Sequence, residues 1–298
     1  MTIHSLRLRA ALCLVALGAA APASAELIYG VASLGVAQNL YSWDSATPLN
    51  VINAPFITGL QNNESILGID FRPATGELFA LGSSSRLYTL NTATGAATQV
   101  PVGGAPFTTS LNGSAFGFDF NPQIDRIRVV SETNQNLVID PNTGAVTTVA
   151  TPLFFAAGDP NAGTDPNVVD SAYDNNVPGG NPTQLYGIDT FLNILVRQAN
   201  SAGTLTTVGP LGAAIDPGAA GAFDVSGSGV AYAALLPQGG SASSFYTINL
   251  ATGTATLVGL IDGGVVITAM SATPIPEPAT VALAACGLVG CMLFRRRR

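Results

Sequence analysis

The sequence of 298 residues contains no lysine, one histidine and three cysteines, and only 10% of its residues are charged. His4 and Cys13 lie near the N-terminus, while Cys286 and Cys291 lie near the C-terminus. The long middle of the chain therefore has no residue for Ser-His-Asp or Cys-His catalysis, for a disulfide, or for histidine ligation of a transition metal. It also has no G-x-S-x-G turn and no glycine-rich phosphate loop. Carboxylate chemistry and the binding of hard cations remain.

Acids greatly outnumber bases in this middle region. Five of the eleven arginines and seventeen of the eighteen acids lie within residues 26–271, so the region has a formal charge of −12. A surface of this sign repels nucleic acid and anionic lipid and attracts cations. Nucleic acid is therefore not an expected partner.

The first 25 residues have the order of a secretory signal peptide. A start with two arginines precedes the apolar run 10–21, and residues 22–25 read Pro-Ala-Ser-Ala. Ala23 and Ala25 form the small-residue A-x-A site at which a signal peptidase cuts. We expect the mature chain to begin at Glu26. The alternative, a buried N-terminal helix, would not require these features in this order.

The C-terminal segment combines three features in a fixed order. A linker over residues 272–278 ends in Pro-Glu-Pro, the sixteen residues 279–294 carry no charge, and residues 295–298 are all arginine. As a helix, the uncharged run would be ~24 Å long, shorter than a typical ~30 Å hydrocarbon core. The arginines would hold its end in the cytoplasm. The residues expected to direct processing here are Pro276, Glu277, Pro278, Arg295, Arg296, Arg297 and Arg298.

This triplet resembles the PEP-CTERM sorting signal of Gram-negative bacteria. The resemblance implies that an exosortase recognises the signal and releases or transfers the protein. It also implies that the chain is exported, held in the inner membrane transiently by its transmembrane helix, and then placed at the cell surface or outside the cell. A plain tail anchor is the alternative, although the helix is short for one.

The middle region contains an internal repeat, marked by a strand that ends in Asn or Asp and is followed by a Thr-Gly turn. Clear copies occupy residues 87–95, 136–144 and 245–253, and weaker copies occupy 40–48 and 195–203. Their last residues are 47, 49, 59 and 50 positions apart. A four-stranded propeller blade repeats at about 40–50 residues.

Further strands extend each copy. Four copies begin with an opening strand, at residues 68–71, 117–120, 172–174 and 222–224. The N-terminal copy lacks one, and residues 265–270 could supply it from the other end of the chain, which would leave no free sheet edge. The sequence thus predicts an all-β exterior domain over residues 26–271, a propeller of five four-stranded blades closed by N- and C-terminal strands. An irregular sandwich or a β-solenoid is the alternative.

The middle region also resembles an uncharacterised bacterial family, domain of unknown function 4394. The resemblance is carried by residues 117–122, 125–131, 134–137, 158–163, 168–169 and 172–176. It spans most of the repeats. Because that family has no established activity, the resemblance supports the fold and assigns no chemistry.

Two groups of polar residues are candidate sites. Asp70, Asp119, Asp174 and Asp224 recur in the four opening strands. They could form a ring of carboxylates for calcium or for acid–base catalysis. Alternatively, each could hold the turn after its strand. Recurrence in every blade favours the structural role, since a catalytic site is asymmetric.

The second group lies in the loop from residue 159 to 176, where Asp159, Asn161, Asp165 and Asp170 offer hard oxygens for calcium. The loop differs from an EF-hand, because its glycine is fifth and an aspartate is twelfth. A solvated loop is the alternative. No cofactor is required, and calcium is the one that the sequence allows.

From these observations we expect a non-catalytic surface or matrix protein whose propeller binds a partner such as exopolysaccharide. The alternative is a carboxylate-dependent glycosidase, since five-bladed propellers host such enzymes. Against it, aromatic residues make up only 7% of the chain and Trp43 is the single tryptophan, whereas sugar-active clefts use aromatic platforms.

Overall fold

The structure, a computed structural model, describes residues 25–35, 37–101, 103–218 and 221–274. This part of the chain contains twenty-one β-strands, two short 3-10 turns and no α-helix. None of its helical segments is long and apolar enough to cross a membrane. The predicted sorting helix 279–294, the tail 295–298 and nearly all of the predicted signal peptide lie outside the described residues.

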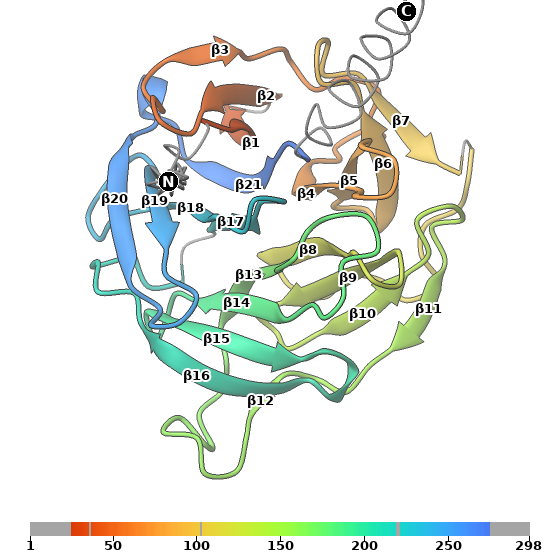
Figure 1. Ribbon diagram of the computed structural model, residues 1–298. Coiled ribbons are helices and arrows are strands. Elements are labelled where there is room, and N and C mark those ends of the chain that lie inside the picture. Colours follow the sequence, from red (N-terminus) through yellow and green to blue (C-terminus); the bar gives the residue numbers. More distant parts are fainter. Residues whose placement is uncertain (1–24, 36, 102, 219–220, 275–298) are drawn as a thin grey trace, which may run out of the picture.

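Five β-sheets surround a common centre (Figure 1). Blade 1 has the order β21-β1-β2-β3, with β21 (Ile267–Ala272), β1 (Leu27–Leu34), β2 (Ala37–Asp44) and β3 (Val51–Asn53). Blade 2 consists of β4 (Ile66–Phe71), β5 (Leu78–Gly82), β6 (Arg86–Leu90) and β7 (Ala97–Val100). Blade 3 consists of β8 (Phe116–Asn121), β9 (Arg126–Ser131), β10 (Asn136–Ile139) and β11 (Val146–Val149).

The remaining two blades follow in chain order. Blade 4 consists of β13 (Val168–Tyr173), β14 (Leu185–Asp189), β15 (Ile194–Ala199) and β16 (Thr204–Pro210). The short strand β12 (Phe154–Phe155) adds a fifth, parallel strand to β16. Blade 5 consists of β17 (Ala222–Val225), β18 (Ala231–Leu235), β19 (Ser244–Ile248) and β20 (Ala255–Leu260).

The position of each strand in its blade follows from its residues. The inner strands β8, β13 and β17 are buried along their whole length, whereas the outer strands β11 and β20 are largely exposed. Five apolar clusters lie between neighbouring blades and form the core. Blade 1 combines both ends of the described chain, because β21 pairs antiparallel with β1 and contacts β17 and β4.

The repeated Thr-Gly turns form between the third and fourth strands of their blades. In the last copy, Asn249 Oδ1 accepts hydrogen bonds from the backbone N–H groups of Ala251 and Thr252, and the N–H of Gly253 donates to the Asn249 carbonyl. Asn91 and Asp140 make the same bonds in blades 2 and 3. The side chain closes the turn locally, which explains why the repeat is visible in the sequence.

The predicted all-β propeller of five blades, built on four-stranded sheets, is confirmed. One opening strand was misplaced, however. The sequence predicts it at residues 172–174, whereas β13 runs from Val168 to Tyr173. Asp174 therefore lies beyond the strand. A bulge in β13 between Val168 and Asp170 accompanies this shift.

Candidate functional site: the acidic centre and an interblade cavity

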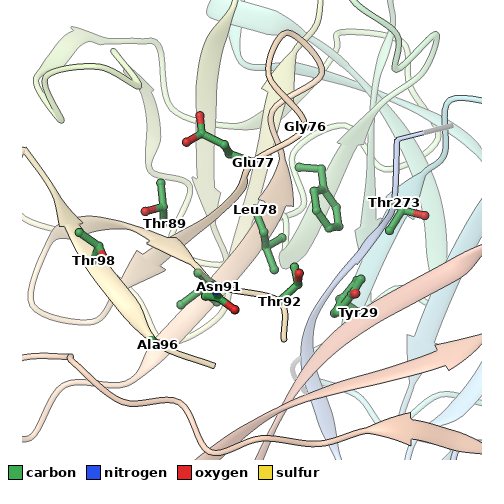
Figure 2. Close-up of a pocket in the computed structure, with 12 residues that line it drawn as sticks. Tyr29, Gly76, Glu77, Leu78, Thr89, Asn91, Thr92, Ala96, Thr98 and Thr273 are labelled. Carbon is green, nitrogen blue, oxygen red and sulfur yellow. The ribbon is translucent and has the colours of Figure 1, made fainter. Parts of the chain in front are cut away.

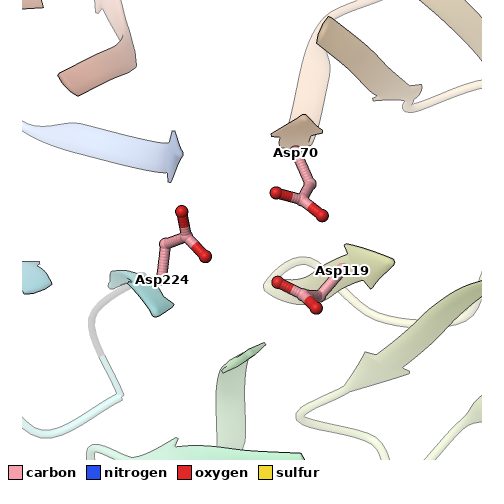
Figure 3. A group of neighbouring side chains, drawn as sticks. All are labelled: Asp70, Asp119 and Asp224. Atoms are coloured by element: carbon pink, nitrogen blue, oxygen red, sulfur yellow. The ribbon is translucent and has the colours of Figure 1, made fainter. Parts of the chain in front are cut away.

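Three carboxylates meet at the centre of the propeller. Asp70 on β4, Asp119 on β8 and Asp224 on β17 turn toward one another (Figure 3). Each is only 1% exposed, and one oxygen from each lies within 4.8 Å of the others. The propeller fold therefore gathers three acids that are 49 and 105 positions apart in the chain.

Each of these acids also ties its blade to the next one. Asp70 Oδ2 accepts from the N–H of Phe120 at 2.8 Å, Asp119 Oδ1 from that of Tyr173 at 3.0 Å, and Asp224 Oδ2 from that of Ala272 at 2.6 Å. In blade 1 the equivalent residue is Ser271. Its hydroxyl accepts from the N–H of Phe71 and lies 2.9 Å from Asp70 Oδ1 and 3.2 Å from Asp224 Oδ2. The three acids thus link neighbouring blades through hydrogen bonds. The structural role expected from the sequence is different, since each acid is predicted to hold the turn after its own strand.

Blade 4 reverses the pattern of the inner strands. The equivalent triplets read Gly-Ile-Asp on β4, Gly-Phe-Asp on β8, Ala-Phe-Asp on β17 and Ala-Met-Ser on β21, but Asp-Ser-Ala on β13. Asp170 therefore stands where other blades have glycine or alanine, and Ala172 stands where three of them have an aspartate and blade 1 has Ser271. Asp170 Oδ2 accepts a 2.7 Å hydrogen bond from the N–H of Phe223 in blade 5. The sequence pattern predicts Asp170 in the loop from residue 159 to 176, not at the centre of the propeller.

Asp174 is not part of this acidic centre. It follows β13, and its Oδ1 accepts a 2.6 Å hydrogen bond from the N–H of Gln184 across the β13–β14 hairpin. The sequence-based grouping of Asp174 with Asp70, Asp119 and Asp224 is corrected accordingly. The carboxylate of Asp174 closes its own hairpin, whereas the other three bridge blades.

The surroundings of the central acids disfavour their charged form. Burial, followed by repulsion from the neighbouring acids, raises the pKa of Asp70 and Asp119 well above the usual value. Burial also raises the pKa of Asp170 well above that value and the pKa of Asp224 to about 6. The ion pairs found in the described part of the chain, Arg72–Asp125 and Arg126–Asp140, involve none of these four acids.

The predicted calcium loop does not gather its acids. Asp159 is bound to β16, where its carboxylate accepts from the N–H of Thr207 at 2.7 Å and from the Thr207 hydroxyl at 2.8 Å. Burial acts to raise the pKa of Asp159, but these hydrogen bonds outweigh it and lower the pKa. Asn161 also binds Thr207, and the exposed Asp165 accepts from Asn134 at 2.7 Å. Asp170 is at the centre of the propeller.

A second candidate site is a cavity between blades 1 and 2, with a volume of about 510 Å³. Its walls come from β1, the end of β4, β5, β6 and β7, and from the residues that follow β4, β6 and β21 (Figure 2). Hydroxyl groups line it, with one amide, Asn91, and one acid, Glu77. The rings of Tyr29 and Phe71 meet edge to face at one side, with centroids 5.6 Å apart. The remaining polar lining residues are Thr89, Thr92, Thr98 and Thr273.

Of the predicted processing residues, the structure describes Ala25 and Glu26. Ala25 is exposed. Glu26 is 8% exposed, and its backbone N–H donates a 2.9 Å hydrogen bond to the Ser45 hydroxyl. Ala23, Pro276, Glu277, Pro278 and the four terminal arginines lie outside the described residues.

Residues 39–271 match the family model described as "Domain of unknown function (DUF4394)". The chain belongs to this family. Residues 274–298 of this DUF4394 protein match the PEP-CTERM protein-sorting motif. That motif indicates export and sorting to the surface of a Gram-negative cell, with processing by an exosortase.

No curated protein matches the chain. One similar solved structure is a protein of unknown function from Bacteroides thetaiotaomicron, with a TM-score of 0.45 and 14% identity over 81% of this chain and 60% of that one. The chain thus spans less than two thirds of that protein. Another is the calcium-binding protein regucalcin from Agrobacterium tumefaciens, with a TM-score of 0.40 and 12% identity over 70% of this chain and 68% of that one.

Proposed function

We propose that this DUF4394 propeller is a non-catalytic binding protein of the cell surface or extracellular matrix, and that its ligand is an exopolysaccharide. The cavity between blades 1 and 2 carries the proposal. A binding role fits the export signal, because an exported chain meets the polymers that the cell secretes. A signal peptidase and an exosortase are its expected processing partners.

The chemistry of the cavity suits a sugar chain. A sugar ring presents many hydroxyl groups around small apolar faces, so it pairs with hydroxyl and amide side chains beside an aromatic ring. Thr89, Thr98 and Asn91 supply the polar groups, and Tyr29 supplies the ring. The cavity volume of about 510 Å³ lies within the usual range for binding sites. Trp43 plays no part, since it is fully buried against Phe245.

The same cavity supports binding over hydrolysis. Glycosidases commonly place two carboxyl groups on either side of the bond that they cut. The lining of this cavity includes one acid, Glu77. The acids that do cluster, Asp70, Asp119 and Asp224, are buried at the centre and bonded to neighbouring strands. The glycosidase alternative would need a second carboxylate at the cavity.

The proposal is tested by measuring the affinity of the full chain, in mild detergent, for the polysaccharide secreted by the producing cell. The variants Thr89→Val and Thr98→Val keep the shape of the side chain but remove one hydroxyl each. Because a neutral hydrogen bond contributes about 0.5–1.5 kcal/mol, each should weaken binding by roughly 2–10-fold. Thr206→Val, on the exposed part of β16, is the matched control and should bind normally.

Unchanged binding in both cavity variants would refute the cavity as the ligand site. The same incubations are analysed for new reducing ends. Release of reducing ends that disappears in Glu77→Gln would replace the binding proposal with the glycosidase reading.

A further inference from the structure

We propose that the centre of the propeller binds one calcium ion, held by carboxylate oxygens of Asp70, Asp119 and Asp224. This inference is independent of the sugar-binding cavity. It differs from the calcium site that the sequence suggested, because the loop residues Asp159 and Asp165 take no part in it.

The geometry of the three acids fits a single ion. Calcium binds oxygen at about 2.3–2.6 Å, so two oxygens on one calcium ion are at most about 5 Å apart. One oxygen from each of Asp70, Asp119 and Asp224 lies within 4.8 Å of the other two. Figure 3 shows that the three carboxylates point into the space between their strands.

An unsatisfied buried atom gives independent support for a ligand. Asp224 is 1% exposed, and its Oδ1 atom has no hydrogen-bond partner. Its other oxygen, Oδ2, is bound by the backbone N–H of Ala272 and faces the Ser271 hydroxyl. A buried carboxylate oxygen without a partner is costly. A cation between the three acids would supply the missing interaction.

Among the described residues, the acids at the centre have no partner in an ion pair, which also favours a bound divalent ion. Within the described part of the chain, neither ion pair reaches Asp70, Asp119 or Asp224, and Asp170 adds a fourth buried acid nearby. A divalent cation at the centre would favour the ionised form of these acids, and hard oxygen donors select a hard cation. Calcium suits the site better than magnesium, which prefers shorter bonds in a strict octahedron and keeps several of its waters.

The binding partners of the acids explain what such an ion would do. Each carboxylate already bonds to the next inner strand through one oxygen. A central ion would join β4, β8 and β17 directly, so that three of the five blades share one ligand. Binding energy that exists only in the folded state stabilises that state. The ion would therefore hold the blades together at the axis.

The test uses the full chain in mild detergent, freed of metal by a chelator, and titrated with calcium by calorimetry. We expect one calcium per chain. At calcium one hundred times its dissociation constant, the melting temperature should rise by about 5–10 °C. Magnesium should bind more weakly, and sodium at matched ionic strength should give no comparable rise. Absence of calcium binding would overturn the proposal.

Isosteric variants test whether the central acids are the residues that bind the calcium ion. Asp224→Asn and Asp119→Asn keep an oxygen acceptor for the neighbouring N–H but remove the charge, so the fold should persist, as circular dichroism can confirm. Each should weaken calcium binding at least tenfold. Asp165→Asn, an exposed acid of the loop, is the control and should bind as the unaltered chain does. Normal calcium affinity in both central variants, or an equal loss in the Asp165 control, would overturn the assignment. Two central variants are used so that one misfolded protein does not decide the result.

Discussion

Asp170 on β13 accepts a 2.7 Å hydrogen bond at Oδ2 from the backbone N–H of Phe223 on β17. Its Oδ1 accepts from the N–H of Ser171 at 2.7 Å. Asp170 is 6% exposed, so these donors have little access to water. The residue joins blade 4 to blade 5, although blade 4 has Ala172 at the position where blades 2, 3 and 5 have their central aspartate.

This contact predicts a clear difference between two substitutions. Asp170→Ala leaves the N–H of Phe223 buried without an acceptor, which should cost about 1–3 kcal/mol of unfolding free energy. Asp170→Asn keeps an acceptor and carries no charge, so it should cost less than about 1 kcal/mol of unfolding free energy. Denaturant unfolding of both variants measures the difference. Equal losses would show that the hydrogen bond to Phe223 contributes little.

The central acids predict how the stability of the metal-free protein depends on pH. Asp224 has a pKa of about 6 in the folded protein against a usual 3.8, and the pKa values of Asp70, Asp119 and Asp170 are also raised. The folded state therefore binds more protons than the unfolded state. Protonation of these acids therefore stabilises the folded state. This stabilisation is complete at a pH below the pKa of the acids in the unfolded chain, and it is lost as the pH rises through their pKa in the folded protein.

Between pH 5 and pH 8, deprotonation of Asp224 alone should lower the free energy of unfolding by roughly 1–2 kcal/mol. The melting temperature measured in the presence of a chelator should fall by roughly 3–6 °C over this pH range. The groups that act on Asp224 include the other three acids, the Ser271 hydroxyl and Glu26. Asp224→Asn should show a smaller fall. A melting temperature that rises steadily from pH 5 to pH 8 would contradict this account.

Gly253 in the last Thr-Gly turn should tolerate alanine poorly for two reasons. Its φ is +84°, and a Cβ atom there would lie 2.4 Å from the carbonyl oxygen of Gly209 in blade 4. Gly229 is the matched control, because its φ is +85° and a Cβ atom would meet nothing within 4 Å. Gly229→Ala should cost about 1–2 kcal/mol through backbone strain alone. Gly253→Ala should lower the free energy of unfolding by about 1–3 kcal/mol more than Gly229→Ala does. Thermal melting of both variants measures the difference. Equal losses would mean that blade 4 moves aside freely.

Processing is tested by the intact mass of the native exported protein. We expect an N-terminus at Glu26, because the A-x-A site ends at Ala25, and loss of the region from about Pro276 onward. N-terminal sequencing checks the first end, and the mass checks both. A mass that includes Arg295 to Arg298 would rule out C-terminal cleavage.

The sequence allowed the blades to be predicted because their turns are local. Asn249 and Gly253 make their bonds within five residues, so the pattern and its spacing survive in the sequence. The strands β8 and β17 are likewise short segments of mainly apolar residues around one aspartate, and both are buried along their whole length. Such features depend little on what the rest of the chain does.

The acidic centre was only partly predictable, because it depends on register. The β13–β14 hairpin is longer than its counterparts, so matching Ala172-Tyr173-Asp174 to Ala222-Phe223-Asp224 shifted blade 4 by two residues. The strand pairing shows the true equivalence. Tyr186 on β14 pairs with Ala172, and Tyr232 on β18 pairs with Asp224, so Ala172 is the residue equivalent to Asp224. Alignment on these second-strand aromatics would have placed Asp170 at the centre. The cavity had no comparable signal, since its lining residues come from separate strands of two blades.

The pairing of β1 with β21 also means that blade 1 cannot be completed until nearly the whole chain has been synthesised. Thr273 bonds to the Leu27 carbonyl, and these residues are 246 positions apart. At about 5–20 residues per second, ribosomes need roughly 10–50 s to make the intervening chain. During that interval β1 has an open edge, the kind of strand on which unfinished sheets aggregate. Because the sorting motif begins at residue 274, directly after β21, blade 1 receives its last strand only when the sorting signal itself begins to be made.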